Sequence, residues 1–373
     1  MSAAGPNESS IALPARKPKE QLATIQAMRG LAAAAVAVFH THLILAQPEY
    51  GGLDILSGVA SKGWLGLNFF FVLSGFIIMN AHASDIGVPH RAMAYCRKRF
   101  IRIYPIYWIV LTAYLLLALR HAGPSKFSWS VVNILSSYML VDLTKNLQLP
   151  LQVAWTLIYE LRFYVFFLLL IMNRVVGFSL LALWLIGIFA NNLGITAYDA
   201  SAFHIWNIYF IVGILVYFAF LNLKNIYGAP IFLFGMIILI ILLPMCGVKH
   251  VGELQNIPLL FSLSLTFGLI LLGAVLFERH SNWRPPALLI ELGSASYSVY
   301  LVHSMLISII AFINHRLFFG TFSPVLVFFV ACASSIGGGM IVHRLVERPL
   351  LGYLNGRMRS RPLSAAPALA DGV

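Results

Sequence analysis

Long apolar runs recur along almost the whole of this 373-residue chain, and they constrain its fold more than any other feature. A helix that crosses the hydrocarbon core of a bilayer needs about 20 mostly apolar residues. Ten segments meet this requirement, so we expect an all-α polytopic membrane protein with ten transmembrane helices. They are residues 28–46, 64–82, 103–119, 153–172, 175–191, 203–222, 229–247, 257–277, 288–312 and 324–346.

The composition supports lipid as part of the solvent. Hydrophobic residues make up 60% of the chain and charged residues 10%, whereas soluble globular chains carry about 25% charged residues. A water-soluble fold of this size would leave too much apolar surface exposed. Segment 130–141 is too short to cross and too apolar for a free loop, so it is expected to be an interfacial or re-entrant helix.

The distribution of Lys and Arg predicts the orientation. With the N-terminus in the cytoplasm and alternating spans, the inner segments hold 18 of these residues and the outer segments hold 6. Both termini are therefore predicted to be cytoplasmic, in the inner membrane of the cell. The formal net charge of +12 reflects this bias and attraction to anionic lipid, so no nucleic-acid partner is expected.

The two ends of the chain are polar and the cysteines are scattered. Residues 1–26 are expected to be a disordered cytoplasmic tail, 27–350 the transmembrane domain and 351–373 a second cytoplasmic tail. Cys96, Cys246 and Cys332 fit neither a metal spacing nor a disulfide framework, so all three are expected to be small core residues and no metal site is expected.

Several ionisable residues fall inside the predicted spans, where they are costly and indicate a function or a buried pair. They are His40, His42, Glu160, Arg162, Glu291 and His303. A rise of 1.5 Å per residue puts His40 about 18 Å above the inner end of its span and Glu160 about 10 Å below the outer end of its own. In a core about 30 Å thick the two side chains lie at one level, with His303 at a similar height.

A histidine and a carboxylate at one depth would suit a general base and its orienting partner. The alternative is that each histidine is a hydrogen-bonded packing residue. Glu160 and Arg162 are two positions apart and point to different sides of a helix, so Glu160 needs a partner on another helix. Glu291 and His42 are expected to be structural.

The basic segment before the third predicted span holds Arg97, Lys98, Arg99 and Arg102. Arg99 and Arg102 are three residues apart and share one face if the segment is helical. Guanidinium groups bind phosphate oxygens bidentately, so this pair suits a phosphate-bearing ligand. The alternative interpretation is an anchor that only sets the orientation.

Five stretches of the chain, in order, resemble the acyltransferase-3 family of membrane O-acyltransferases, particularly members that acetylate exopolysaccharides and related glycans. They are residues 25–40, 63–76, 98–105, 155–164 and 292–303, and residues 346–349 also fit. The family usually has Val-Asp where this chain has Leu67 and Asn68. By this resemblance His40 is the essential histidine, Arg99 and Arg102 form the pair linked to acyl-CoA, and Glu160 belongs to the fourth motif.

The resemblance implies transfer of an acetyl or other short acyl group from cytoplasmic acetyl-CoA, or another acyl-CoA, to a sugar hydroxyl. The acceptor would be an exopolysaccharide, a lipid-linked sugar or another cell-surface glycan. The CoA phosphates would bind Arg99 and Arg102, with Arg97 as a third candidate. A homo-oligomer or an association with polysaccharide-synthesis machinery is compatible with this activity, and no metal is required.

In this mechanism neutral His40, oriented by Glu160 or another partner, accepts the hydroxyl proton as the oxygen attacks the acyl carbon. The candidates for contact with the substrate or the oxyanion are Asn68, Trp155, Tyr164, Ser298 and His303. A covalent acyl-histidine intermediate is a variant of the same scheme. The main rival is a transporter or flippase for a lipid-linked sugar, which would also have many spans and intramembrane ionisable groups. A scaffolding protein would not explain ionisable groups at one depth.

Overall fold

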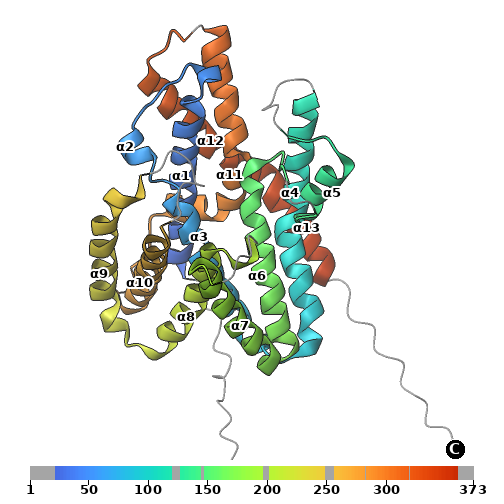
Figure 1. The fold of residues 1–373 in the computed structure, drawn as a ribbon, viewed down its shortest axis with the longest axis vertical. Helices are drawn as coiled ribbons and strands as arrows, with labels where there is room; N and C mark the ends of the chain where they lie inside the picture. The colour runs from blue at the N-terminus through green and yellow to red at the C-terminus, as the bar shows by residue number, and fades with distance from the viewer. Residues whose placement is uncertain are drawn as a thin grey trace, which may run out of the picture.

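A computed structural model of the chain describes residues 22–119, 127–143, 147–195, 201–247, 256–281, 283–318 and 320–359. These residues form helices joined by short turns and contain no strand (Figure 1). The α-helices are α1 (Ala23–Leu45), α2 (Ser57–Ala60), α3 (Leu65–His82), α4 (Ala92–Leu119), α5 (Val131–Met139), α6 (Trp155–Met172), α7 (Arg174–Asn192), α8 (Ile208–Asn222), α9 (Gly228–Leu242), α10 (Ile257–Ser281), α11 (Ala287–Phe312), α12 (Pro324–Val342) and α13 (Arg348–Arg359).

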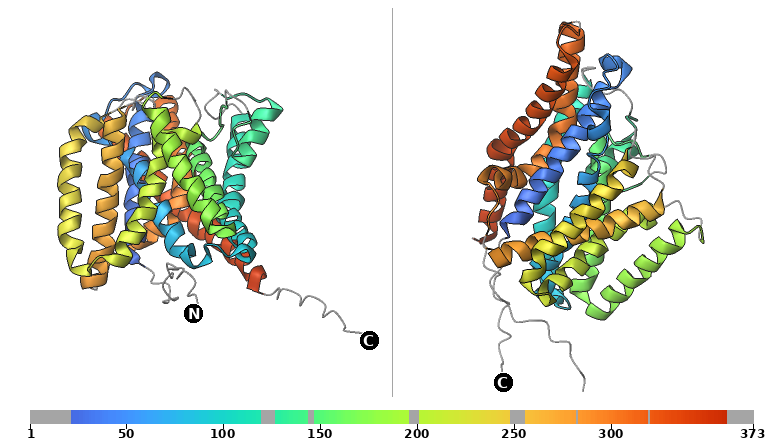
Figure 2. Two further views of the ribbon diagram at one scale, coloured as in Figure 1. Left: turned by 60° about the horizontal axis from the view of Figure 1, so that its bottom comes forward. Right: turned by 90° about the vertical axis from the view of Figure 1, so that its left-hand side faces the viewer.

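The predicted fold class is confirmed. Within the described residues, 10 helical stretches are long and apolar enough to cross a membrane. The long helices lie side by side, and α1 begins and α13 ends at the same edge of the bundle (Figure 2, left). An even number of crossings brings the two ends to one side of a membrane. That this side is the cytoplasm remains a prediction from the Lys and Arg distribution.

Three of the differences between the observed and the predicted helix boundaries affect the basic segment or the ends of the chain. α4 begins at Ala92 rather than near residue 103, so the basic segment 97–102 lies within the helix and not in the loop before it. Arg102 is ten residues past Ala92, about 15 Å along the helix axis. α1 begins at Ala23, so residues 23–26 are helical. The last span continues through a π-helical turn, His343–Glu347, into α13, which makes residues 351–359 helical. Residues 1–21 and 360–373 of the predicted tails lie outside the described residues.

The predicted short helix at 130–141 is present as α5, which packs against α4. Two aromatic side chains of α4 donate hydrogen bonds to carbonyl oxygens at the C-terminal end of α5. Tyr107 Oη donates to Ser137 O (2.7 Å), and Trp108 Nε1 donates to Tyr138 O (2.9 Å). The last carbonyls of a helix lack partners within it, and these donors supply them. Ser130 caps the N-terminus by accepting from the backbone N–H of Asn133. Because both ends of α5 have hydrogen-bond partners, its nine residues form a helix, although this helix is too short to cross a membrane.

The close contact between α1 and α11 positions the functional residues. A Cβ on Gly293 would lie 1.8 Å from Gln26 O, and a Cβ on Gly30 would lie 2.9 Å from Gly293 N. Only glycine allows the two backbones to approach this closely, as is common where helices pack in membranes. The contact brings Arg29, near the start of α1, beside Ser296. Further along α1 it brings His40 beside His303.

The outer helices differ from the inner ones in burial. Of the residues in α9, at one edge of the bundle in Figure 1, only Gly228 and Gly235 are buried, although the helix is almost entirely apolar. Such a surface is stable against lipid and not against water. The interior is formed mainly by α1, α3, α8, α10 and α11. The three cysteines are unpaired, with Cys246 and Cys332 buried and Cys96 half-buried.

Candidate active site

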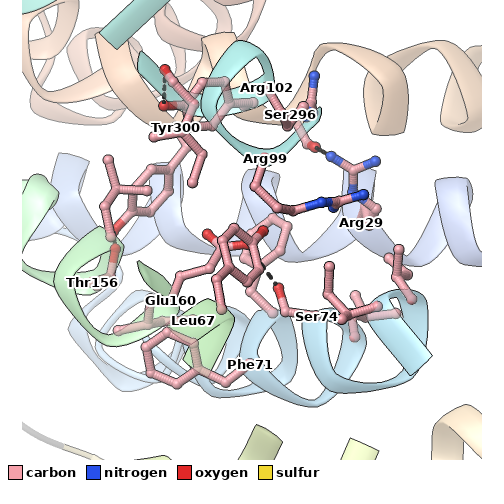
Figure 3. A pocket seen from close by; sticks show the side chains of 18 residues that line it. Arg29, Leu67, Phe71, Ser74, Arg99, Arg102, Thr156, Glu160, Ser296 and Tyr300 are labelled. Atoms are coloured by element: carbon pink, nitrogen blue, oxygen red, sulfur yellow. Dashed lines mark hydrogen bonds between the residues drawn. The ribbon is translucent and has the colours of Figure 1, made fainter. Parts of the chain in front are cut away.

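A cavity of about 140 Å³ lies among α1, α3, α4, α6 and α11, and we call it the arginine cavity (Figure 3). Its walls hold three guanidinium groups, Arg29, Arg99 and Arg102, and one carboxylate, Glu160. The rest of the lining is mostly apolar or aromatic. Each arginine reaches the cavity from within a membrane-spanning stretch, where an ionised side chain is costly unless it is paired or serves a function.

Arg29 and Arg99 have no carboxylate partner within the described part of the chain. Arg29 donates to Gln26 Oε1 (3.1 Å) and Ser296 Oγ (2.9 Å), which are both neutral. Arg99 Nη2 donates to His82 Nε2 (3.2 Å), and its guanidinium lies over the ring of Tyr164, 5.7 Å from the ring centre. The Nε of Arg99 is buried and makes no hydrogen bond. These two cations therefore border the cavity without a direct ion pair, although the Glu160 carboxylate lies in the same cavity.

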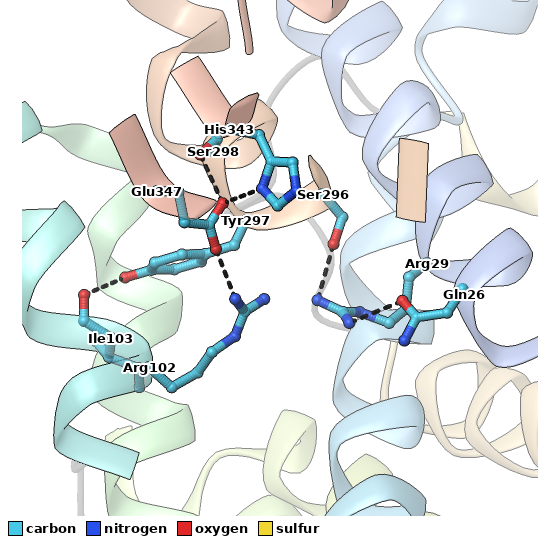
Figure 4. Close-up of polar contacts among 9 residues, drawn as sticks. All are labelled: Gln26, Arg29, Arg102, Ile103, Ser296, Tyr297, Ser298, His343 and Glu347. Atoms are coloured by element: carbon cyan, nitrogen blue, oxygen red, sulfur yellow. Dashed lines mark hydrogen bonds and ion pairs between the residues drawn. The ribbon is translucent and has the colours of Figure 1, made fainter. Parts of the chain in front are cut away.

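Arg102 differs because it is paired with a buried acid (Figure 4). Its Nη1 lies 2.5 Å from Oε1 of Glu347, whose side chain is 0% exposed. The other oxygen of Glu347 accepts from Ser298 Oγ (2.7 Å) and contacts His343 Nδ1 (2.7 Å). Glu347 thus joins α4 to α11 and to the π-helical turn after α12. Its charge balances Arg102, so the excess positive charge of the cavity comes from Arg29 and Arg99, which share the one lining carboxylate, Glu160.

Glu160 lies in the arginine cavity and not beside His40. Its Oε1 accepts from Tyr164 Oη (2.5 Å) and Ser74 Oγ (3.2 Å). Among the described residues no hydrogen bond joins Glu160 to His40. The expected orientation of His40 by Glu160 is therefore wrong. Helix rise placed the two residues at a similar depth, but it carried no information about the direction in which each side chain points.

His40 lines a second, smaller space of about 20 Å³, which we call the histidine cavity. This volume is close to that of one water molecule, so substrates need a local opening to enter. His40 Nδ1 is 3.0 Å from Val36 O and 3.2 Å from Nε2 of His303. The two imidazole rings meet edge to face with their centres 4.8 Å apart. The partner of His40 is thus the other intramembrane histidine at the same depth.

Leu67 and Tyr300 line both cavities and form the wall between them. The hydroxyl of Tyr300 is fixed by Val153 O (2.9 Å) and by Thr156 Oγ1 (2.7 Å). Leu67 comes from α3, and it is buried but makes no polar contact that would hold it. A ligand that extended from the arginine cavity to His40 would have to pass between these two side chains.

The five candidates for contact with the oxyanion or the substrate lie in different parts of the site. Trp155 lines the histidine cavity. Asn68 is fully buried and donates to Tyr209 Oη (3.0 Å), and Ser298 donates to Glu347. Neither residue lines the arginine cavity or the histidine cavity. Tyr164 lines the arginine cavity and donates to Glu160. His303 is 1% exposed and contacts His40 directly.

The indole N–H of Trp155 makes no hydrogen bond within the described residues and is not enclosed by protein atoms. Trp155 also lines the histidine cavity, so its N–H is a candidate donor to a ligand bound there. Among the five candidates, Trp155 alone combines a position in the histidine cavity with an unused donor.

Other ionisable residues singled out in the sequence lie away from the two cavities. Arg97 is exposed on α4 and lines neither of them. Arg162 points to another side of α6, where it donates to Ser201 Oγ (2.8 Å). His42 lies 3.7 Å from Asp54, and Glu291 pairs with Arg344 at 2.5 Å.

Sequence reasoning did not identify Arg29 and Glu347 as site residues. Arg29 contributes to the Lys and Arg distribution that predicts the orientation, but it lies six residues inside α1 and within the first family-like stretch. Glu347 lies in the late stretch 346–349, whose resemblance to the family implies no role for a single residue. A charged residue inside an otherwise apolar helix was the available signal in the case of Arg29.

Comparison with known proteins gives one match. A family model described as an acyltransferase domain, that of the acyltransferase-3 family, matches residues 22–344. Neither the curated proteins nor the solved structures contain a match to the chain. The matched region includes both cavities and every residue that lines them, whereas Glu347 lies just beyond it.

Proposed function

This chain belongs to the acyltransferase-3 family of membrane acyltransferases, and from that premise we propose that it transfers an acetyl or other short acyl group from cytoplasmic acyl-CoA to a hydroxyl of an exopolysaccharide, a lipid-linked sugar or another cell-surface glycan. The arginine cavity receives the phosphates of the donor. The histidine cavity is where the acyl group meets the sugar hydroxyl.

The observation that carries this proposal is a pair of guanidinium groups, Arg29 and Arg99, that form no direct ion pair among the described residues and outnumber the carboxylate of their cavity, Glu160. They lie next to the cavity that holds His40. Unpaired cations inside a membrane-spanning bundle are costly, and an anionic ligand offsets that cost. Guanidinium groups suit phosphate because several N–H donors point at its oxygens from one plane. Coenzyme A carries several phosphates at one end and the thioester at the other.

The spacing of the two cavities suits the shape of this donor. Arg29 and His40 are eleven residues apart on α1, about 16 Å along the helix axis. The pantetheine arm is a thin chain of comparable length. With the phosphates at Arg29 and Arg99, the arm would run beside α1 and pass between Leu67 and Tyr300. Its thioester would then reach His40.

The reaction needs one base and one oxyanion donor at that point. His40 takes the proton from the sugar hydroxyl as the oxygen forms a bond to the acyl carbon. The tetrahedral intermediate then loses its carbon–sulfur bond, and the protonated His40 returns the proton to the departing sulfur. We assign the oxyanion donor to the indole N–H of Trp155, because this donor is unused and Trp155 lines the same cavity.

The test is transfer of label from radiolabelled acetyl-CoA to a glycan by the purified protein in lipid vesicles. His40→Ala should abolish transfer while leaving acetyl-CoA binding intact. His42→Ala is the matched control, because His42 lies on the same helix but lines neither cavity, and it should retain transfer. Full transfer by His40→Ala would remove the assignment of the base. Movement of a lipid-linked sugar across the vesicle membrane without any acyl transfer would favour the flippase instead.

A further inference from the structure

The hydrogen-bond partners of His40 and His303 determine where their protons lie. A backbone carbonyl oxygen can only accept, and each neutral imidazole has one N–H donor and one acceptor nitrogen. His303 Nδ1 is 3.1 Å from Val299 O, so this nitrogen must carry the proton. The Nε2 of neutral His303 is then an acceptor. Since it lies 3.2 Å from His40 Nδ1, the proton in that contact belongs to His40.

The second contact of His40 gives the same assignment. Its Nδ1 also lies 3.0 Å from Val36 O, which again can only accept. Both neighbours of Nδ1 are therefore acceptors, and the reverse arrangement would place two lone pairs against each other at Val36 and at Val299. Neutral His40 then has an unprotonated Nε2. This atom makes no hydrogen bond within the described residues and is not enclosed, so its lone pair borders the histidine cavity.

We propose that His303 is a positioning residue that fixes His40 in the Nδ1–H form and stabilises the imidazolium that His40 becomes during transfer. This inference rests on the proposed function, because it gives His40 the role of general base. When Nε2 takes the hydroxyl proton, the Nδ1–H bond to His303 becomes a charge-assisted one, which is roughly twice as strong as a neutral bond. No bond within His303 is made or broken.

A neutral partner suits the surroundings of this pair. Many catalytic histidines are oriented by a carboxylate, but a carboxylate that is ionised at this depth would itself need a counter-ion. His303 is 1% exposed, and at such a buried position a neutral acceptor requires no second charge. The carboxylate that the sequence placed at the same depth, Glu160, is bonded to Tyr164 and Ser74 instead.

Two substitutions at residue 303 separate positioning from packing. His303→Gln places an amide oxygen near the former Nε2 and can still accept from His40, whereas His303→Leu cannot. We expect His303→Leu to lower kcat roughly 10- to 100-fold, the rate equivalent of one hydrogen bond to a charged group, with the KM for acetyl-CoA unchanged. His303→Gln should recover most of this loss. Equal kcat values for Leu and wild type, or equal loss in Leu and Gln, would overturn the proposal.

A spectroscopic test distinguishes failure of this inference from failure of the proposed function. In protein labelled with ¹⁵N-histidine, the resonances of His40 are those lost in His40→Gln. Wild type should show Nδ1 protonated and Nε2 unprotonated, whether or not transfer activity is found. The opposite tautomer in wild type would overturn the inference even if the protein transfers acyl groups. The expected tautomer without any transfer to a glycan would leave the tautomer assignment standing but refute the proposed function, and with it the role of His303 during transfer.

Discussion

Removing the carboxylate of Glu347 should destabilise the protein far more than removing that of Glu291, although both form ion pairs at 2.5 Å. The Glu347 side chain is 0% exposed and its partner Arg102 is 30% exposed, whereas Glu291 and Arg344 are 41% and 59% exposed. Breaking a buried pair by removing one partner costs about 3–5 kcal/mol, because the other charge remains buried. An exposed pair contributes about 0–1 kcal/mol.

We expect a loss of about 3 kcal/mol for Glu347→Ala, the lower end of that range, because Arg102 keeps some access to the arginine cavity. Glu291→Ala should cost less than about 1 kcal/mol. Glu347→Gln should fall between them, since an amide oxygen still accepts from Arg102 and Ser298 but carries no charge. The assay is reversible unfolding in mixed micelles at increasing SDS, followed by circular dichroism. Equal losses for Glu347→Ala and Glu291→Ala would refute the argument that burial sets the cost.

Three further substitutions test the two cavities. Arg99→Ala should weaken acetyl-CoA binding at least tenfold. Arg97 is exposed and lies about half a turn away on α4, so Arg97→Ala should leave the affinity within about twofold. Titration calorimetry measures both affinities, and equal weakening would argue for a general surface attraction. Trp155→Phe keeps an aromatic ring but removes the N–H, so kcat should fall about 10²- to 10³-fold with little change in the KM for acetyl-CoA. An unchanged kcat would remove the oxyanion role of Trp155. Leu67→Trp should narrow the wall between the cavities, so that acetyl-CoA still binds but transfer stops; retained transfer would mean that the donor takes another path.

The fold could be predicted from the sequence because lipid imposes a length on every crossing segment. The ten spans required only apolar runs of sufficient length, and all ten have a counterpart in the structure. The start of α4 could not be predicted in this way. Hydropathy treats Arg97, Arg99 and Arg102 as the end of the span, but inside a bundle arginines can be accommodated by a buried acid, by aromatic rings and by a polar cavity.

The candidate site was only partly predictable, since depth along a helix follows from residue number but direction around it depends on packing. His40 and His303 were placed at one level, and they do lie in contact. Glu160 was placed at that level too, yet its side chain turns toward the arginines. Its position relative to His40 depends on how α6 is rotated against α1, and this rotation is set by side-chain contacts across several helices. Glu347 is 245 residues from Arg102 in the chain, so its partner could not be found from local spacing.

The most direct test of the account is a structure of the protein with an acyl-CoA analogue that cannot transfer its acyl group, determined by electron cryo-microscopy in lipid nanodiscs. We predict phosphate oxygens within hydrogen-bond distance of the Arg29 and Arg99 guanidinium groups, the pantetheine arm between Leu67 and Tyr300, and the acyl carbon beside Nε2 of His40. An analogue bound with its phosphates outside the arginine cavity, or with its acyl group separated from His40 by an intact wall, would contradict the account.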